Sequence, residues 1–577
     1  MTEDPRDLPR LFLPVALMLV LTASALMSRP PLPVDETRYL SVAWEMHESG
    51  DWLVPHKNGA TYAHKPPLLF WIMNALWLLT GPTGWSARLA GPAMAVVSIL
   101  FTYQLGKQLW NRKDVAQAAA LIQTSMMLWM VFSTLTMFDT LQTVTAQMTL
   151  LAYQDIASRG LRKRSILLAS AGIGLGILAK GPVIFVHVLP VALSAPWWCS
   201  ASLRIGRWYL TVAMTIVFGG IIGLSWALAA AASGGQAYAE ELLWGQTANR
   251  VVESFSHKQP FWFYLLVLPI GVLPWPLFSR CTANLMSAIR DRSNRFCLAG
   301  IVGTLQVMSL VSGKQPYYLV PSIPLVALLI ARTMMTNATR VERSEKYLQV
   351  AATLFAAVTP AVVNMVPQLA VTRLNNVCPT IYSVALVLVS LSVLIPVQET
   401  PIRMIRHHAT ASVMFLSVLV VGLGNGFWQE FDLSPMARFV RVQQEAGEAV
   451  FWYGGYHGQL NFMGRLEQPL VEGPKEVLLQ WVKENPGGVV VMRAIDDIRD
   501  FSEQNQGDDQ RRAAIERQLQ QTGFPDQPLV VEKVLFDQPL RRGLSVGVIA
   551  AVRLRFTTDE RTTETQGKQG KEASETL

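Results

Sequence analysis

The chain has 577 residues, of which 51% are hydrophobic and 16% are charged, and its mean hydropathy is +0.29. It is too apolar for a soluble enzyme and too long for one membrane bundle, so it should be a polytopic membrane protein with an appended domain. The net charge of +8 does not indicate nucleic-acid binding, because most basic residues fall in short loops between apolar runs, where the positive-inside rule explains them. The cysteines are scattered without a CxxC pair, which argues against a disulfide framework and a cysteine zinc site: Cys199, Cys281, Cys297 and Cys378.

About thirteen apolar runs are long enough to cross a bilayer. They lie near residues 11–27, 87–108, 115–135, 140–157, 165–180, 182–198, 208–231, 261–280, 296–312, 317–334, 347–367, 379–396 and 409–428. The first run ends in small residues, as a signal peptide does, but it is long for such a segment and its flank carries acidic residues, so we expect an uncleaved helix. The run at 68–79 is shorter, and we expect it to lie at the membrane interface.

The basic loops set the orientation. With the N-terminus in the cytoplasm, the cytoplasmic loops hold the clusters Arg112 and Lys113, Arg159 to Arg164, Arg204 and Arg207, Arg280 to Arg295, Arg340 to Lys346, and Arg403 to His408, as the positive-inside rule requires. The opposite side then receives the loop 28–86, Asp139, Lys180, the segment 234–260, Lys314 and everything after Gln429. The ionisable residues of interest therefore converge on one side of the membrane.

The pattern changes near Gln429. Residues 430–556 alternate strand-like pieces such as VFWYGG and GGVVVMRA with polar helical stretches near 437–448, 474–485 and 508–521, which predicts a small α/β domain on the side opposite the basic loops. Residues 557–577 lack large apolar side chains until their end, and we expect them to be disordered. The predicted fold is a polytopic α-helical membrane domain at 1–429, followed by this α/β domain.

Acidic residues mark the predicted loop. Charges cost about 2.5 to 3.5 kcal/mol each at the centre of a bilayer helix, so the charged stretch from Asp35 to Trp71 should fold over the membrane surface. Asp35 and Glu36 follow PPLPV; a carboxylate pair there can accept a proton, hold a cation or bind a sugar hydroxyl, and the alternative is a helix N-cap. Asp139 is a lone acid between two long apolar runs, which favours function over a turn cap.

Three lysines stand at helix mouths on the same predicted side. Lys65 lies in HKPPLLFW, Lys180 in LAKGP and Lys314 in SGKQPYYLVP. A single lysine at a helix end usually snorkels to the interface, but three together with Arg250 favour a phosphate site, because Lys and Arg supply charge-assisted donors. His64 and His257 form a zinc pair only if the fold brings them together and a further ligand or water completes the shell.

Several motifs together resemble a known family. DETRY, WEMHESGDWLVPHKNG and YAHKPPLLFW, with FD at 138–139, AKGP at 179–182, NRVVESFSHKQPFWFY at 249–264, GVLPW at 271–275 and KQPYYLVPSIPLVAL at 314–328, resemble the membrane GT-C glycosyltransferases. The likeness is strongest to the bacterial 4-amino-4-deoxy-L-arabinose lipid A transferases, relatives of the protein O-mannosyltransferases. It covers roughly residues 10 to 430, while the C-terminal domain is matched only in position and class.

This resemblance implies a donor sugar on undecaprenyl phosphate, transferred with inversion to an acceptor such as lipid A at the periplasmic face of the bacterial inner membrane. It implies that Asp35 and Asp139 line the sugar cavity, that Lys65 and Lys180 support it, and that Lys65, Arg250 and Tyr318 meet the lipid phosphate. The predicted substrate and phosphate-binding set is completed by Glu36, Arg38, Tyr39, Tyr62 and Lys314. Relatives hold zinc between the residue before the KPP lysine and the histidine matching His257, so the resemblance implies that His64 and His257 bind zinc. This chain departs from the family at the first of these positions, where a glutamate is usual.

Other functions remain open at this point. A lipid-linked sugar transporter would show internal repeats and a midplane site built from broken helices, and neither is visible in the sequence. A lipid phosphatase would need a nucleophile beside a proton donor, for which His257 and Asp139 are weak candidates. The sugar could also be a hexose or uronic acid, and the acceptor a glycan or protein.

Overall fold

A computed structural model describes residues 8–199, 204–245, 258–278, 289–336, 347, 350–351, 353–355, 357–358, 379–395, 400–424, 426–494, 529–542 and 545–556. The chain divides into two compact units. The first comprises residues 1–369 and 374–429, and the second comprises residues 370–373 and 430–577.

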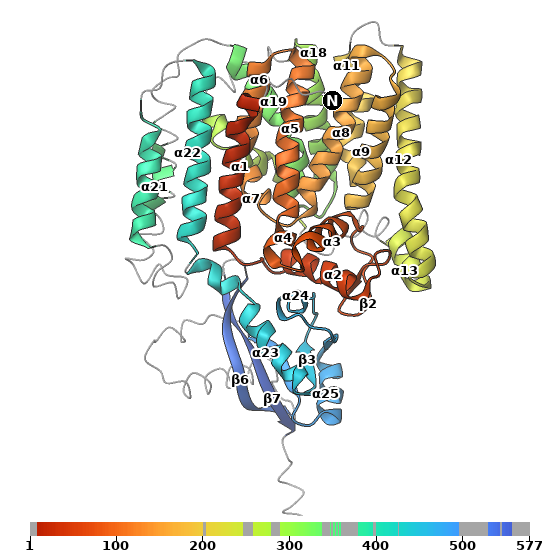
Figure 1. Ribbon diagram of the computed structural model, residues 1–577, viewed down its shortest axis with the longest axis vertical. Helices are drawn as coiled ribbons and strands as arrows, with labels where there is room; N and C mark the ends of the chain where they lie inside the picture. The colour runs from red at the N-terminus through yellow and green to blue at the C-terminus, as the bar shows by residue number, and fades with distance from the viewer. Residues whose placement is uncertain are drawn as a thin grey trace, which may run out of the picture. The chain divides into compact units, whose positions relative to one another are not determined.

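The first unit is a helical bundle (Figure 1). Its longer helices are α1 (Leu8–Ser28), α5 (Ala90–Trp110), α8 (Phe138–Arg159), α9 (Lys163–Lys180), α12 (Ile205–Ser233), α18 (Arg292–Leu310), α19 (Ile323–Thr336) and α22 (Pro401–Gly422). Shorter helices are α6 (Lys113–Thr124), α7 (Met127–Phe132), α10 (Ile184–Leu193), α11 (Ala195–Trp198), α13 (Gln236–Glu240), α15 (Phe263–Gly271) and α21 (Thr380–Ser392).

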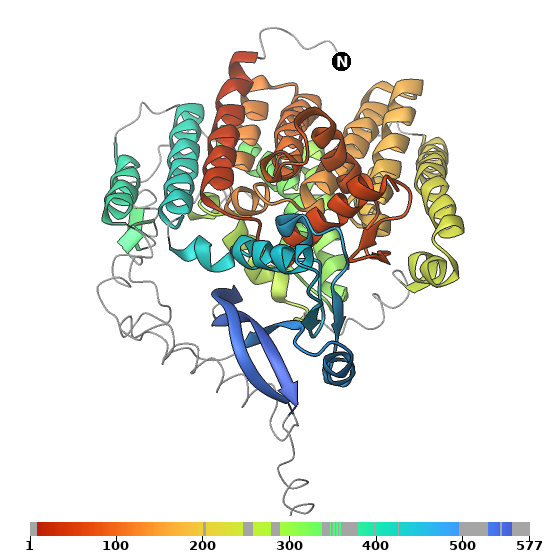
Figure 2. The ribbon, with the colours of Figure 1, turned by 60° about the horizontal axis from the view of Figure 1, so that its bottom comes forward.

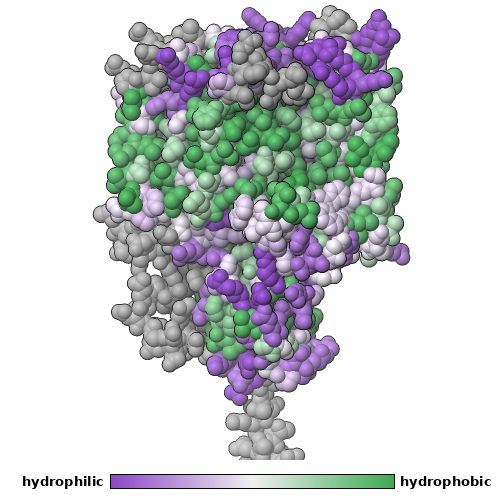
Figure 3. All heavy atoms as spheres, in the orientation of Figure 1, coloured by the Kyte–Doolittle hydropathy of each residue, from purple (hydrophilic) through white to green (hydrophobic). Residues whose placement is uncertain are grey.

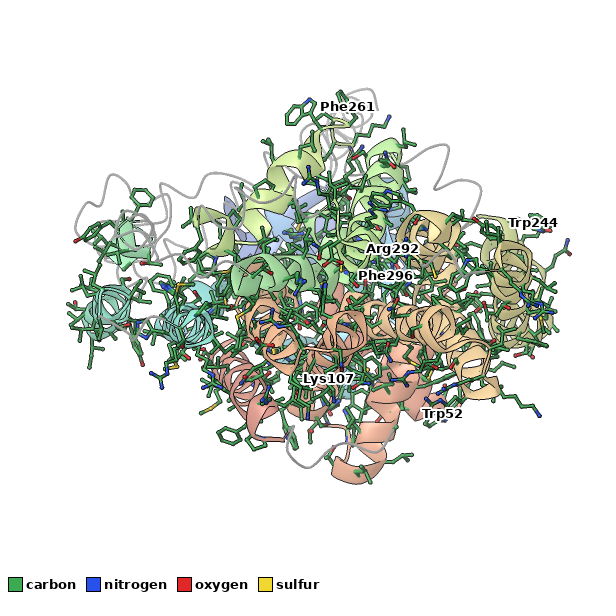
Figure 4. All side chains as sticks on the ribbon, turned by 90° about the horizontal axis from the view of Figure 1, so that it is seen from above. Trp52, Lys107, Trp244, Phe261, Arg292 and Phe296 are labelled. Atoms are coloured by element: carbon green, nitrogen blue, oxygen red, sulfur yellow. The ribbon has the colours of Figure 1, made fainter. Side chains whose placement is uncertain are left out.

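Six helical stretches of the described chain are long and apolar enough to cross a membrane: 9–28, 84–110, 163–193, 205–233, 316–336 and 401–422. The prediction of a multi-pass membrane protein is confirmed at this level, and the count of thirteen crossings stays a prediction. On the face shown in Figure 3, apolar side chains of the bundle form a band with hydrophilic side chains at both of its ends. Trp244 and Phe261 lie at the periphery of the bundle and point away from it (Figure 4), each 73% exposed, as suits side chains that face lipid.

The apolar run predicted at 115–135 is two helices rather than one. α6 ends at Thr124 and α7 begins at Met127, with Met126 in an extended conformation. The segment that follows α15 holds the break, because Met127 N–H donates to Leu273 O at 3.1 Å and Trp275 Nε1 donates to Ser125 Oγ at 3.2 Å. Hydropathy alone does not register such a break, because both pieces are apolar.

Helices α9 and α12 approach closely through glycines. A Cβ on Gly219 would lie 2.7 Å from Ile173, and one on Gly223 would lie 2.4 Å from Ile177. In the opposite direction, a Cβ on Gly174 would lie 2.6 Å from Ile222. Small residues allow this kind of backbone approach between membrane helices, and it fixes the helix that ends in Lys180.

Between α1 and α5 the chain forms α2 (Asp35–Ser49), a small hairpin of β1 (His56–Lys57) and β2 (Ala60–Thr61), α3 (Leu68–Thr80) and α4 (Gly84–Arg88). These elements gather at the end of the bundle where α1 finishes (Figure 1). The hairpin turns through Asn58 and Gly59, both at positive φ, and the Glu45 carboxylate accepts their N–H groups at 2.5 and 2.9 Å. We call the region from Asp35 to Arg88 the cap; within it, the charged side chain of Glu45 stabilises the turn of the hairpin.

The second unit holds a five-stranded sheet in the order β4-β3-β5-β7-β6. The strands are β3 (Val450–Tyr453), β4 (Val471–Gly473), β5 (Val489–Ala494), β6 (Leu529–Arg542) and β7 (Ser545–Phe556). β3 runs parallel to β4 and β5, while β7 is antiparallel to both β5 and β6, and β6 and β7 form the long paired arrows of Figure 2.

Helices cover both faces of this sheet. α25 (Lys475–Glu484) packs Leu478 and Trp481 against Phe451, and α23 (Ser434–Glu445) packs Met436 on the opposite face. A short helix, α24 (Asn461–Gly464), follows β3. The predicted helix at 508–521 and the tail 557–577 lie outside the described residues.

Candidate active site

Asp139 and Lys180 meet in the first unit. Asp139 lies in the first turn of α8 and is 3% exposed, and Lys180 is the last residue of α9. Lys180 Nζ donates to Asp139 Oδ1 at 2.6 Å. An acid at a helix N-terminus and a cation at a helix C-terminus are each favoured by the helix dipole. Two residues predicted from separate motifs therefore form one buried ion pair.

Two tyrosines lie against this pair. They come from the 3₁₀ helix η5 (Pro316–Ser322), and Lys180 Nζ lies 5.4 Å from the ring centre of Tyr317 and 4.8 Å from that of Tyr318. Both distances allow a cation–π interaction. Tyr318 was predicted from the family resemblance, whereas Tyr317, its neighbour in KQPYYLVP, was missed.

Asp35 is the first residue of α2. The N-cap of this helix is Val34 and has no side-chain capping bond, so the cap alternative for Asp35 is wrong. Instead, Asp35 Oδ1 accepts hydrogen bonds from Arg38 and, at 3.4 Å, from Tyr39 Oη. Its side chain is 37% exposed, which leaves the carboxylate accessible.

The neighbours of Asp35 keep their protons. Burial raises the pKa of Tyr39 well above its ordinary value, so Tyr39 is a neutral O–H donor. Burial acts to lower the pKa of Arg38, but Tyr62, Tyr39 and Asp35 outweigh it and the pKa of Arg38 is raised. The arginine therefore stays charged beside the carboxylate.

An aromatic cluster connects the cap to α8. The Tyr39 and Phe138 ring centres are 4.9 Å apart, those of Phe70 and Phe138 are 5.6 Å apart, and those of Tyr62 and Phe70 are 6.5 Å apart. Lys65 Nζ lies 5.7 Å from the ring centre of Phe138, the residue next to Asp139. The predicted residues Tyr39, Tyr62 and Lys65 thus lie around the start of α8.

Glu36 is placed differently from the expectation. It is 2% exposed and binds Arg29, the N–H of Leu32 at 3.0 Å and the N–H of Thr136 at 2.8 Å. Burial acts to raise the pKa of Glu36, but the charges of Arg29 and Arg88 outweigh it, so the pKa is lowered. Its oxygens are already bonded inside the protein and join the end of α1, the start of α2 and the segment before Asp139. This geometry supports a structural role for Glu36, and its assignment to substrate binding stays a prediction.

Lys314 is also used internally. It is 4% exposed, and its Nζ donates to Gln259 O at 2.9 Å, an arrangement that fastens the strand-like segment before η5 rather than presenting the ammonium to a ligand. The direct phosphate contact expected of Lys314 is therefore not what this geometry supports. Sequence analysis could not foresee this, because the partner is a backbone carbonyl.

Of the two predicted zinc ligands, only His64 lies among the described residues. His64 Nε2 lies 3.7 Å from Glu241 Oε1, and both side chains are about half exposed. Arg250 and His257 lie outside the described residues. Within the described part of the chain, no cluster of three His, Cys, Asp or Glu side chains is found, and two donors are fewer than the three protein ligands of a typical catalytic zinc site.

Part of the chain is similar in sequence to known glycosyltransferases. The family model of dolichyl-phosphate-mannose-protein mannosyltransferases matches residues 64–226. A protein of Yersinia enterocolitica named undecaprenyl phosphate-alpha-4-amino-4-deoxy-L-arabinose arabinosyl transferase is 30% identical over 322 residues, covering 52% of this chain and 54% of the relative. A protein of the same name from Pectobacterium atrosepticum is 31% identical over 311 residues, with the same coverage.

The chain therefore spans about half the length of the relatives it matches in sequence. The crystal structure of ArnT from Cupriavidus metallidurans bound to undecaprenyl phosphate superposes with a TM-score of 0.70 at 17% identity, covering 93% of this chain and 97% of ArnT. The ArnT structure in the apo state gives a TM-score of 0.68. The resemblance inferred from the motifs is confirmed, and the chain has the ArnT fold.

Proposed function

We propose that this protein is a membrane glycosyltransferase that moves 4-amino-4-deoxy-L-arabinose from undecaprenyl phosphate to lipid A or a related acceptor. The observation that carries the proposal is the convergence of Asp35, the Asp139–Lys180 pair and Lys65 at one end of an apolar bundle. The names of the sequence relatives, and a bound undecaprenyl phosphate in a protein of the same fold, support the choice of donor.

The location proposed for this chemistry is the periplasmic face of the bacterial inner membrane. The basic loops support it, since the positive-inside rule assigns them to the cytoplasm and sends Asp35, Asp139 and Lys180 to the other side. In this scheme the chain crosses the membrane about thirteen times, and residues 430–556 form a periplasmic domain.

The reaction breaks the bond between the anomeric carbon and an oxygen of the carrier phosphate, and that oxygen keeps the electron pair. A new bond forms between the anomeric carbon and an oxygen of the acceptor, which attacks from the opposite face and inverts the configuration. Negative charge grows on the departing phosphate, and in this scheme Lys65 and Arg250 supply the cationic donors that stabilise it. Tyr318, against Lys180, adds a neutral donor.

The two carboxylates have different tasks in this scheme. Asp139 is buried and paired with Lys180, and its role is to orient the sugar through hydrogen bonds. Asp35 is accessible, and it accepts the proton if the acceptor is a hydroxyl. If the acceptor is the phosphate of lipid A, already anionic, no base is required and Asp35 also orients the sugar.

A reconstitution experiment tests the proposal. The purified chain in lipid nanodiscs is mixed with undecaprenyl phosphate bearing a labelled aminoarabinose and with lipid A, and the products are identified by mass spectrometry. We expect labelled lipid A and free undecaprenyl phosphate. A transporter would form no product in the nanodiscs and would move the donor across the membrane of a reconstituted vesicle, and a phosphatase would release sugar phosphate; either result would replace the proposal.

Zinc binding by His64 and His257 stays a prediction. The proximity of Glu241 to His64 is compatible with a cation at this position. Protein purified without chelator should contain zinc that is lost in His257→Ala and His64→Ala, while His47→Ala, in which a histidine bonded to Asn74 is replaced, should keep it. Protein that carries no metal at all would remove zinc from the scheme.

A further inference from the structure

Tyr317 is fixed in place by its neighbours. Its ring centre lies 5.5 Å from that of Phe132 on α7 and 5.0 Å from that of Tyr318, with the two tyrosine planes 87° apart. Lys180 Nζ lies over the same ring. Contacts on several sides leave the ring little rotational freedom, so the position of its hydroxyl is well defined.

Tyr317 lies beside the ion pair of the site. Lys180 Nζ is 5.4 Å from the Tyr317 ring centre and donates to Asp139 Oδ1 at 2.6 Å. The ring of Tyr317 therefore borders the same lysine that Asp139 binds. Among the described residues, no hydrogen bond is made to the Tyr317 hydroxyl, and the side chain is only partly buried.

Asp35 and Asp139 each use only one carboxylate oxygen for the hydrogen bonds found among the described residues. Asp35 uses Oδ1 for Arg38 and Tyr39, and Asp139 uses Oδ1 for Lys180. Among the described residues, the Oδ2 atoms of both carboxylates have no hydrogen-bond donor. A ligand that places donors on two carboxylates and a further polar group on a phenol is a ring with several hydroxyl or amino substituents, because a phenol both donates and accepts.

We propose that Tyr317 is a specificity residue for the transferred sugar, with its hydroxyl bound to a hydroxyl or amino substituent of the ring that Asp35 and Asp139 hold. This inference rests on the proposed function and goes beyond it, because it separates the roles of two adjacent tyrosines. Tyr317 recognises the sugar, and Tyr318 serves the carrier phosphate. A site built to hydrogen-bond a substrate group discriminates strongly against analogues that lack it.

The test uses Tyr317→Phe, which keeps the ring contacts with Phe132, Tyr318 and Lys180 and removes only the hydroxyl. We expect kcat/KM for the sugar-bearing donor to fall about tenfold, while the affinity for undecaprenyl phosphate without sugar stays at the wild-type value. Tyr318→Phe is the matched control and should weaken binding of the sugar-free carrier. Thermal unfolding of both variants should match the wild type.

A second arm distinguishes recognition from a structural role. Donors with one sugar substituent removed at a time are compared in the wild type and in Tyr317→Phe. For one of these donors the variant should lose nothing further, because the contact is already absent; a structural defect would lower kcat/KM equally for all donors.

The outcomes separate the two levels of inference. Wild-type kcat/KM in Tyr317→Phe, an equal loss for every donor, or an equal loss of sugar-free carrier binding would overturn the role of Tyr317 while leaving the transferase intact. A wild-type protein that transfers no sugar would instead reject the proposed function, and the specificity role with it.

Discussion

Asp35 and Glu36 are adjacent carboxylates with opposite environments. The Asp35 side chain is 37% exposed and is held by Arg38 and Tyr39, whereas Glu36 is 2% exposed and is bound by Arg29 and two backbone N–H groups. One region of the cap is therefore open to a ligand and the other is closed. A pair of acids in a sequence need not act as a pair in the fold.

The difference follows from helix geometry. Successive residues of an α-helix are separated by about 100° around its axis, so two neighbours at the start of α2 face different surroundings. Glu36 faces the end of α1 and the segment before α8, and Asp35 faces the tyrosines. Replacing an accessible carboxylate should therefore mainly lower the transfer activity, and replacing a buried carboxylate should mainly lower the free energy of unfolding.

Asp139→Asn should have the largest effect, because Asp139 combines both properties: it is buried, and it belongs to the site. We expect transfer to fall by about a hundredfold or more. We also expect a loss of unfolding free energy of about 3–5 kcal/mol, because Lys180 is left without its partner in a buried position. Labelled-sugar transfer and thermal unfolding in detergent measure the two effects.

The double variant Asp139→Asn, Lys180→Met separates them. Removing both charges should recover much of the stability while transfer stays lost. Near-normal turnover of Asp139→Asn at saturating donor would show that Asp139 only stabilises the fold.

Glu36→Gln should strongly affect stability. It removes the charge that balances Arg29 and Arg88 in a buried cluster, so we expect a loss of about 3–5 kcal/mol. Turnover per folded molecule should stay within about a few-fold of the wild type, because Glu36 does not meet the substrate in this arrangement. Unfolding by denaturant, followed beside active-site-normalised transfer, measures both; an intact fold with abolished turnover would return Glu36 to the substrate set.

Asp35→Asn should show the opposite pattern. An accessible ion pair contributes less than about 1 kcal/mol, so the unfolding midpoint should hardly change. Transfer should fall, though less than in Asp139→Asn, because the isosteric amide can neither accept a proton nor carry the charge. Near-wild-type turnover would mean that the open carboxylate has no part in the reaction.

The cationic residues predicted to bind the carrier phosphate should affect binding and turnover when they are replaced. Lys65→Ala and Arg250→Ala should each weaken binding of undecaprenyl phosphate about tenfold and lower turnover, because a phosphate near the membrane surface interacts with cations in a dielectric lower than that of water. Lys107→Ala, at the predicted cytoplasmic end of α5, is the matched control and should do neither. Wild-type affinity in both site variants would place the phosphate elsewhere and reopen the transporter reading.

Several residues of the candidate site could be predicted from the sequence. The isolation of Asp139 between apolar runs, the three lysines at helix mouths and the family motifs were enough to predict Asp35, Asp139, Lys65 and Lys180, because charges are rare in membrane segments unless they have a function. The ArnT fold also followed from the motif order. These signals are local, and each is visible in a single stretch of chain.

The features that could not be predicted from the sequence depend on contacts between distant segments of the chain. Glu36 and Lys314 carry the same side chains as true ligand-binding residues, and only the positions of Thr136 N–H and the Gln259 carbonyl show that they are already used. Tyr317 was missed because its proximity to Lys180 is set by how η5 packs on α7 and α8. Neither periodicity nor motif spacing contains that information.

The smallest expected effect concerns acid stability, and it tests the closed region without perturbing the open one. The pKa of Glu36 is lowered in the folded state, so below the ordinary glutamate value of about 4.3 the unfolded chain binds a proton that the folded protein does not. Stability from Glu36 is thus fully present above that pH and is lost as the pH falls toward the lower folded pKa. Within this window the wild type should lose up to about 1.4 kcal/mol per pH unit from this residue, and Glu36→Gln should lack that component. Denaturant unfolding of both proteins across the window measures the difference in slope; equal slopes would mean that the Glu36 carboxylate is not stabilised in its charged form.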